Sequence, residues 1–147
     1  MDNKKILEYS VIIMAVVAVL FFAWEFTNRD VRFCRLALDG LAKGSVKAEK
    51  FIDWEKLIAT RLDVGATYRR IAKPEDKNIY RRLFIRNFAV GFQNVKGNVK
   101  KFTNWRVLER KGTKVVVGAD YLLYNKTILF TLSKLPKTKI TVIEWKE

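Results

Sequence analysis

Arg81 is the side chain in this sequence whose type and surroundings best suit a binding site. On a helical wheel of about 100° per residue, Arg81 falls about 20° from Phe88 and from Phe92, within an aromatic stripe. A guanidinium in that position can bind a phosphate or a carboxylate through paired hydrogen bonds. Alternatively, the stem of Arg81 covers the aromatic rings while its charged end reaches water.

Other basic and aromatic side chains near Arg81 complete the candidate site. The basic members would contact an anionic headgroup, and the aromatic members would contact an apolar chain. The predicted ligand or headgroup site comprises Arg81, Arg69, Arg70, Lys73, Tyr80, Phe84 and Phe88.

The counts of histidine and cysteine exclude several chemistries. The chain has no histidine and one cysteine, Cys34, which excludes a Ser-His-Asp triad, a Cys-His dyad, a Cys/His metal site and an internal disulfide. Cys34 lies in an apolar pattern and is predicted to be a small buried side chain, with lipidation or an intermolecular disulfide as alternatives. We predict no catalytic residue, no metal and no cofactor.

The helix that carries Arg81 is predicted over about 75–95. Proline and two acidic residues after Lys73 are typical of a helix start. The aromatic stripe recurs every four residues, and three aliphatic residues are predicted to widen it. The stripe consists of Tyr80, Phe84, Phe88 and Phe92, widened by Ile79, Leu83 and Val90.

Shorter helices are predicted before this one, and strands after it. Residues 29–43 have helical apolar spacing, Ser45 can cap a short helix over 46–54, and 55–72 is predicted to be helical in pieces, broken at Gly65. Strand-like segments follow at 99–110, 114–124, 127–133 and 140–145, with turn residues between them. We therefore expect an α+β fold, with helices over 29–95 packed on a curved, cone-like, four-stranded antiparallel sheet over 98–146.

An apolar run from Ile6 to Phe26 precedes this domain, which spans 29–147. Its 21 positions would cover roughly 31 Å as a helix, close to the ~30 Å hydrocarbon core of a bilayer. We predict a short tail and a single transmembrane helix within 1–28. The predicted anchor residues are Val11, Ile12, Val16, Leu20, Phe22 and Trp24.

Two alternatives to a membrane anchor are a buried core helix and a cleaved signal peptide. A core helix that is apolar on all sides would need protein all round it, and the end of the run lacks a small-residue cleavage pattern. Both observations favour a retained signal anchor. The topology stays open, because basic residues after the span favour a cytoplasmic domain, whereas the short basic head at Lys4-Lys5 favours an extracytoplasmic one, which we expect.

The charge of the chain limits its partners. It has 29 Lys and Arg against 15 Asp and Glu, a net charge of +14, and the excess lies after Asn28. Anionic lipid headgroups are immediate candidates for a basic domain beside a membrane. No zinc finger, RNA-recognition signature or basic arm indicates nucleic acid. The alternative is that the charge only keeps the surface soluble.

Helices followed by a curved antiparallel sheet resemble the nuclear transport factor 2-like superfamily. Phe51 to Phe92 is similar to the MlaC phospholipid-shuttle family, through Ile52-Asp53-Trp54, Gly65 and Lys73-Pro74-Glu75. The resemblance implies a cone-shaped pocket between helices and sheet. MlaC-like shuttles are longer and are released from the membrane as soluble proteins, whereas this chain keeps an apparent anchor. In this respect the chain resembles more closely the bitopic assembly factors of type IV secretion systems, which have one membrane span and a domain of this fold.

Some members of that superfamily are isomerases or dehydratases that use an Asp, Tyr or His in the cone. The corresponding candidates here are Asp53, Asp63, Asp120, Tyr68, Tyr80 and Tyr121. Each aspartate has a simpler interpretation, as a cap, a loop residue or an outward strand residue, so we expect no enzyme. We expect a single-span binding or scaffold protein, a subunit or assembly factor of an envelope complex with membrane-protein partners. The alternative is binding of a lipid or other amphiphile in the cone.

Overall fold

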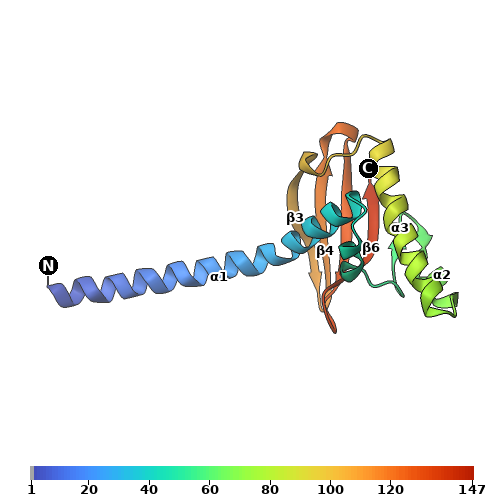
Figure 1. Ribbon diagram of the computed structural model, residues 1–147. Helices are drawn as coiled ribbons and strands as arrows, with labels where there is room; N and C mark the ends of the chain where they lie inside the picture. Colours follow the sequence, from blue (N-terminus) through green and yellow to red (C-terminus); the bar gives the residue numbers. More distant parts are fainter. Residues whose placement is uncertain (1) are drawn as a thin grey trace.

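The computed structural model describes residues 2–147 and has one long helix that projects from an α+β domain (Figure 1). Helix α1 (Asn3–Ala42) is continuous over 40 residues, about 60 Å. Helix α1 thus joins the apolar run to the helix predicted over 29–43 without a break. The N-terminal part of α1 is long and apolar enough to cross a membrane, and none of its most apolar window is buried.

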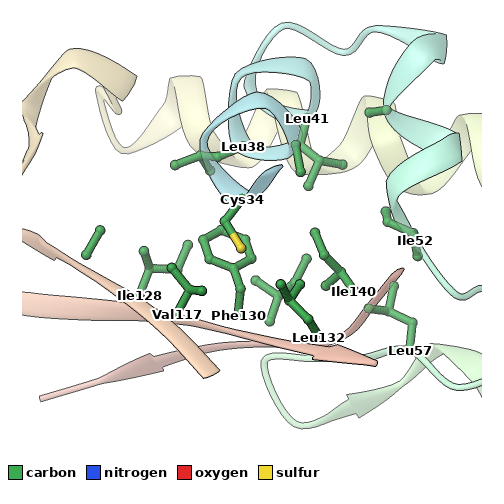
Figure 2. Packing of buried hydrophobic residues seen from close by; sticks show 14 of the residues in the cluster. Cys34, Leu38, Leu41, Ile52, Leu57, Val117, Ile128, Phe130, Leu132 and Ile140 are labelled. Atoms are coloured by element: carbon green, nitrogen blue, oxygen red, sulfur yellow. The ribbon is translucent and has the colours of Figure 1, made fainter. Parts of the chain in front are cut away.

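The C-terminal part of α1 packs on the sheet and forms the centre of the core. Cys34, Leu38 and Leu41 follow at intervals of four and three residues, so they share one face of the helix, and all are fully buried. Figure 2 shows them above Phe130 and Ile140 of the sheet. Cys34 is therefore a buried apolar side chain, as predicted, and its burial raises the pKa of the thiol well above the ordinary value, with Asp30 adding to the shift.

The segment after α1 differs from the prediction. Ser45 caps a short 3₁₀ helix, η1 (Val46–Phe51), by accepting a hydrogen bond from the Lys47 amide at 3.3 Å. Within 55–72, predicted to be helical in pieces, α2 (Val64–Arg70) is a helix, but β1 (Ile58–Ala59) and β2 (Leu62–Asp63) precede it. The prediction was wrong for the residues of β1 and β2, because β1 is held by hydrogen bonds to β6, and local propensity does not report such distant partners.

Gly65, predicted to break a helix, lies within α2. A Cβ atom there would come within 2.4 Å of the Glu55 carbonyl oxygen. Glycine is required at this position because the loop before β1 passes directly against the helix backbone.

Helix α3 (Pro74–Asn94) confirms the prediction for 75–95, with proline in its first turn. Ile85 and Ala89 are buried, and the four aromatic residues of the stripe are half-buried against the core. The aliphatic residues expected to widen the stripe do not: Ile79, Leu83 and Val90 are exposed, whereas α3 packs on α1 and η1.

The four predicted C-terminal strands form an antiparallel meander, but the predicted four-stranded sheet was wrong. The strands are β3 (Phe102–Lys111), β4 (Lys114–Tyr121), β5 (Lys126–Ser133) and β6 (Lys139–Lys146), with the 3₁₀ turns η2 (Val99–Lys101) before β3 and η3 (Leu122–Tyr124) before β5. Strand β1 adds to β6 in parallel, so the sheet is six-stranded and mixed, in the order β2-β1-β6-β5-β4-β3. The α+β class holds.

Candidate functional site

A groove runs between α3 and the sheet. Its larger hollow, about 560 Å³, lies between the C-terminal half of α3 and the ends of β4, β5 and β6. Its lining is mainly apolar and aromatic and consists of Thr60, Asn87, Phe88, Gly91, Phe92, Val95, Gly97, Tyr121, Tyr124, Lys126 and Trp145. A hollow of this size and composition is typical of a site for a small apolar ligand.

A second hollow of about 420 Å³ extends the groove toward the N-terminal half of α3. The two hollows share Thr60, Asn87 and Phe88, so they form one groove. Tyr80 and Val95 mark its two ends along α3, 15 residues apart, which corresponds to about 22 Å of helix.

Aromatic contacts hold the wall of the larger hollow. Phe102 packs against Tyr121 with ring centroids 4.6 Å apart, and against Phe92 and Trp145 at 6.2 and 5.9 Å. The Tyr124 hydroxyl donates a hydrogen bond to the Val95 carbonyl at 2.6 Å, which joins η3 to the end of α3. These contacts join the C-terminal end of α3 to β3 and to η3 beside the hollow.

Lys126 is the one basic side chain among the described residues that line the larger hollow. It lies at the first position of β5, after the left-handed residue Asn125, and is exposed. The lining also includes the polar side chains of Thr60 and Asn87. The groove thus combines a long apolar wall with one cation at its larger end.

The structure separates the predicted site residues into two groups. Tyr80, Phe84 and Phe88 line the groove, as the aromatic part of the prediction requires. Arg81 lines a different hollow, beside η1. The predicted basic and aromatic residues therefore do not form one site.

Arg81 is held by three partners within the protein. Its guanidinium donates to the Tyr68 hydroxyl at 2.7 Å, to Glu49 Oε2 at 3.3 Å and to the Asn78 side chain. Its side chain is only 20% exposed. These bonds engage all three nitrogens of the guanidinium within the protein, and they join η1, α2 and α3 to one another.

The other predicted basic residues lie near the start of α3. Arg69 donates to the Glu55 carbonyl, and Arg70 and Lys73 are exposed between α2 and α3. None of the three lines either hollow of the groove in the described part of the chain.

The three aspartates considered for catalysis lie outside the described lining of the groove. Asp63 caps α2 by accepting from the Ala66 amide at 2.9 Å, and the Asp53 amide donates to the Ile140 carbonyl. Asp120 accepts from Asn104 and Thr127, and these bonds hold its pKa below the ordinary value, with Arg106 adding to the effect. Among residues 2–147, no group of three or more acidic or cysteine side chains could hold a metal ion.

Sequence reasoning missed Lys126, Thr60 and Trp145. Trp145 is at the end of a predicted strand and Lys126 in a predicted turn, but their proximity to α3 is a tertiary contact between distant segments. Thr60 lies in the turn between β1 and β2, which were not predicted at all.

No family model, no curated protein and no solved structure matches this chain. Its function is therefore inferred from the groove and from helix α1.

Proposed function

We propose that the protein is a single-span, membrane-anchored binding protein whose groove between α3 and the sheet binds an amphiphile. The observation that carries the proposal is the groove itself, in which two adjoining hollows form an apolar channel with Lys126 at one end. The cation would pair with an acidic headgroup and the aromatic wall would enclose the chain.

Helix α1 supports the membrane anchor. Its side chains from Ile6 to Phe26 are exposed along almost the whole length, and the helix satisfies its own backbone hydrogen bonds, as a bilayer requires. A core helix would be covered by protein, whereas none of the apolar window is buried. The unbroken continuation of the helix into the core at Cys34 supports retention of the anchor rather than cleavage.

The dimensions of the groove favour an acyl chain. One leaflet of a bilayer is about 15 Å deep, half of the ~30 Å core, and the groove extends over about 22 Å of α3. Its hollows of about 560 and 420 Å³ fall in the range of small-molecule sites. The resemblance to the nuclear transport factor 2-like superfamily, with its pocket between helices and sheet, agrees with this location and remains part of the proposal.

A second candidate function is that of a scaffold in an envelope complex. Leu122 and Leu123 are 74% and 55% exposed in η3, beside Val95 and Tyr124 at the rim of the groove. An apolar rim of this kind suits contact with a membrane-protein partner.

We place the domain outside the cytoplasm, on the basis of the short basic head at Lys4-Lys5.

Native mass spectrometry of the full chain, extracted in detergent, separates the two functions. Gly91 lines the larger hollow, and a Cβ atom there meets nothing within 4 Å, so Gly91→Trp would fill the groove without a backbone clash. We expect a co-purified amphiphile in the wild type and in the control Gly91→Ala, and its loss in Gly91→Trp. An empty wild-type protein that co-purifies with membrane proteins would support the scaffold instead.

A further inference from the structure

Three segments meet where α1 enters the domain, and we call them the helix-exit surface. They are residues 25–33 of α1, the β3–β4 hairpin at 109–114, and the β5–β6 loop at 133–138. Asp30 joins them: it binds Arg110 of the hairpin at 2.9 Å and Lys134 of the loop. The Lys134 amide also donates to the Thr113 carbonyl at 2.9 Å.

The helix-exit surface lies at the end of the apolar run. The Arg110 guanidinium lies 5.7 Å from the centroid of the Phe26 ring, the last residue of that run. Asp30 is four residues further on, about 6 Å along the helix axis. The hydrocarbon core of a bilayer is about 30 Å thick and the whole bilayer about 40–45 Å, so each headgroup layer is some 5–7 Å thick. A span that ends at Phe26 therefore brings Arg110 and Lys134 to the level of the headgroups.

The charge of the helix-exit surface is positive after its internal ion pairs are counted. Its three acids, Glu25, Asp30 and Glu109, each pair with bases of the same surface. Its seven bases are Arg29, Arg32, Arg110, Lys111, Lys114, Lys134 and Lys137. Seven bases minus three acids leave +4.

An exposed leucine lies among these cations. Leu135 is 66% exposed in the β5–β6 loop, between Lys134 and Lys137. Cations that flank an exposed apolar residue suit the interface of a bilayer, where the apolar side chain enters the acyl boundary and the cations stay at the headgroups. Nucleic acid would use the cations but not the leucine.

We propose that the helix-exit surface binds anionic phospholipid headgroups of the bilayer that α1 spans, and so docks the domain against the membrane. The inference rests on the proposed membrane anchor and does not depend on the groove. It is supported by the position of the surface at the end of the apolar helix and by its charge. In Figure 1, α1 leaves the domain on the side of β3, the edge strand whose hairpin carries Arg110, Lys111 and Lys114.

The test uses the full chain in nanodiscs of phosphatidylcholine, with and without phosphatidylglycerol. A nitroxide attached at Thr113→Cys, in the hairpin turn, reports collisions with a nickel-chelating lipid. Lys56→Cys is the control site, since it precedes β1, and β1 and β3 lie toward opposite edges of the sheet. Cys34 is buried, so we expect it not to take up the label.

We expect phosphatidylglycerol to raise the collision rate several-fold at Thr113 and to leave it unchanged at Lys56. The triple variant Lys111→Gln, Lys114→Gln, Lys137→Gln should lose the increase, because it removes three exposed charges without touching the Asp30 pairs. The matched triple variant Lys56→Gln, Lys73→Gln, Lys146→Gln should keep it.

Two results would count against the inference, and they are distinguishable. Equal collision rates at Thr113 in both bilayers, in a protein that has entered the nanodisc, would overturn docking on anionic lipid. The partner of the helix-exit surface would then be an acidic protein or nucleic acid. A chain that does not enter nanodiscs at all would overturn the proposed membrane anchor, and the docking surface with it.

Discussion

The carboxylate of Asp30 lies 2.9 Å from the guanidinium of Arg110, 80 residues further along the chain. Asp30 is 2% exposed and also binds Lys134 of the β5–β6 loop. The carboxylate therefore attaches the long helix to two separate parts of the sheet, at the level where the apolar run ends. This contact ties α1 to the sheet at the point where the helix leaves the domain.

Asp30→Asn should destabilise the full chain by about 2 kcal/mol. Loss of the charge leaves two cations without their buried partner, and the ~3–5 kcal/mol typical of a broken buried pair is reduced because Arg110 and Lys134 are 37% and 31% exposed. Urea denaturation in detergent measures the difference. The control Asp39→Asn removes an exposed pair with Lys43 and should cost less than about 0.5 kcal/mol. Equal losses in the two variants would contradict the role of Asp30.

Gly65→Ala and Gly91→Ala should change stability in opposite directions. Alanine at Gly65 would place its Cβ 2.4 Å from the Glu55 carbonyl oxygen, so we expect a loss of about 1–3 kcal/mol. Alanine at Gly91, where a Cβ meets nothing within 4 Å, should add about 0.5–1 kcal/mol through helix propensity. Thermal denaturation of both variants tests the pair. A stabilised Gly65→Ala variant would show that the loop before β1 moves freely.

Cys34 should resist thiol reagents in the native protein. Burial raises the pKa of its thiol, so almost no thiolate forms near neutral pH, and the side chain is fully enclosed. We expect no labelling by an impermeant maleimide until urea unfolds the domain. Rapid labelling of the native chain would contradict the packing of α1 on the sheet.

Because buried Cys34 should not react, a cysteine introduced by Thr113→Cys would be the only reactive thiol and would report the topology. The residue lies in the β3–β4 turn, and an impermeant reagent should label it in intact cells if the domain is extracytoplasmic, as we propose. The wild-type chain, with only Cys34, is the background control. Labelling that requires lysis would place the domain in the cytoplasm.

Asp120 should contribute to the pH dependence of stability. Hydrogen bonds from Asn104 and Thr127 lower its pKa in the folded state, so its contribution is complete above the unfolded value of about 3.9 and is lost as the pH falls through the lower folded value. Urea titrations at neutral and strongly acidic pH should show a gap between wild type and Asp120→Asn at neutral pH that closes in acid. A gap that is independent of pH would assign the effect of the substitution to packing.

Local patterns in the sequence were sufficient for much of the fold. The aromatic repeat from Tyr80 to Phe92 identified α3, and alternation with turn residues identified the last four strands, because the periods of helix and strand are properties of adjacent residues. They did not identify β1, whose two residues are strand only because β6 supplies hydrogen bonds from more than 80 positions away.

The residues of the candidate site were likewise predictable only where they share one local element. Tyr80, Phe84 and Phe88 were predicted as an aromatic wall and line the groove, since they share one helical face. Arg81 was interpreted as a ligand-binding or surface cation, yet Glu49, 32 residues earlier, is one of the partners that hold it inside the protein. Charge partners of this kind come from other elements, so the local sequence does not report them.

The sequence by itself determined that 21 consecutive, mostly apolar residues form a helix of membrane length, and that a basic α+β domain follows. Both follow from composition and from periodicities within one segment. Only the tertiary structure decided that β1 completes a mixed sheet, that the groove carries Lys126 rather than Arg81, and that Asp30 attaches the helix to the sheet. These features are contacts between distant segments, which exist only after the chain has folded around its core.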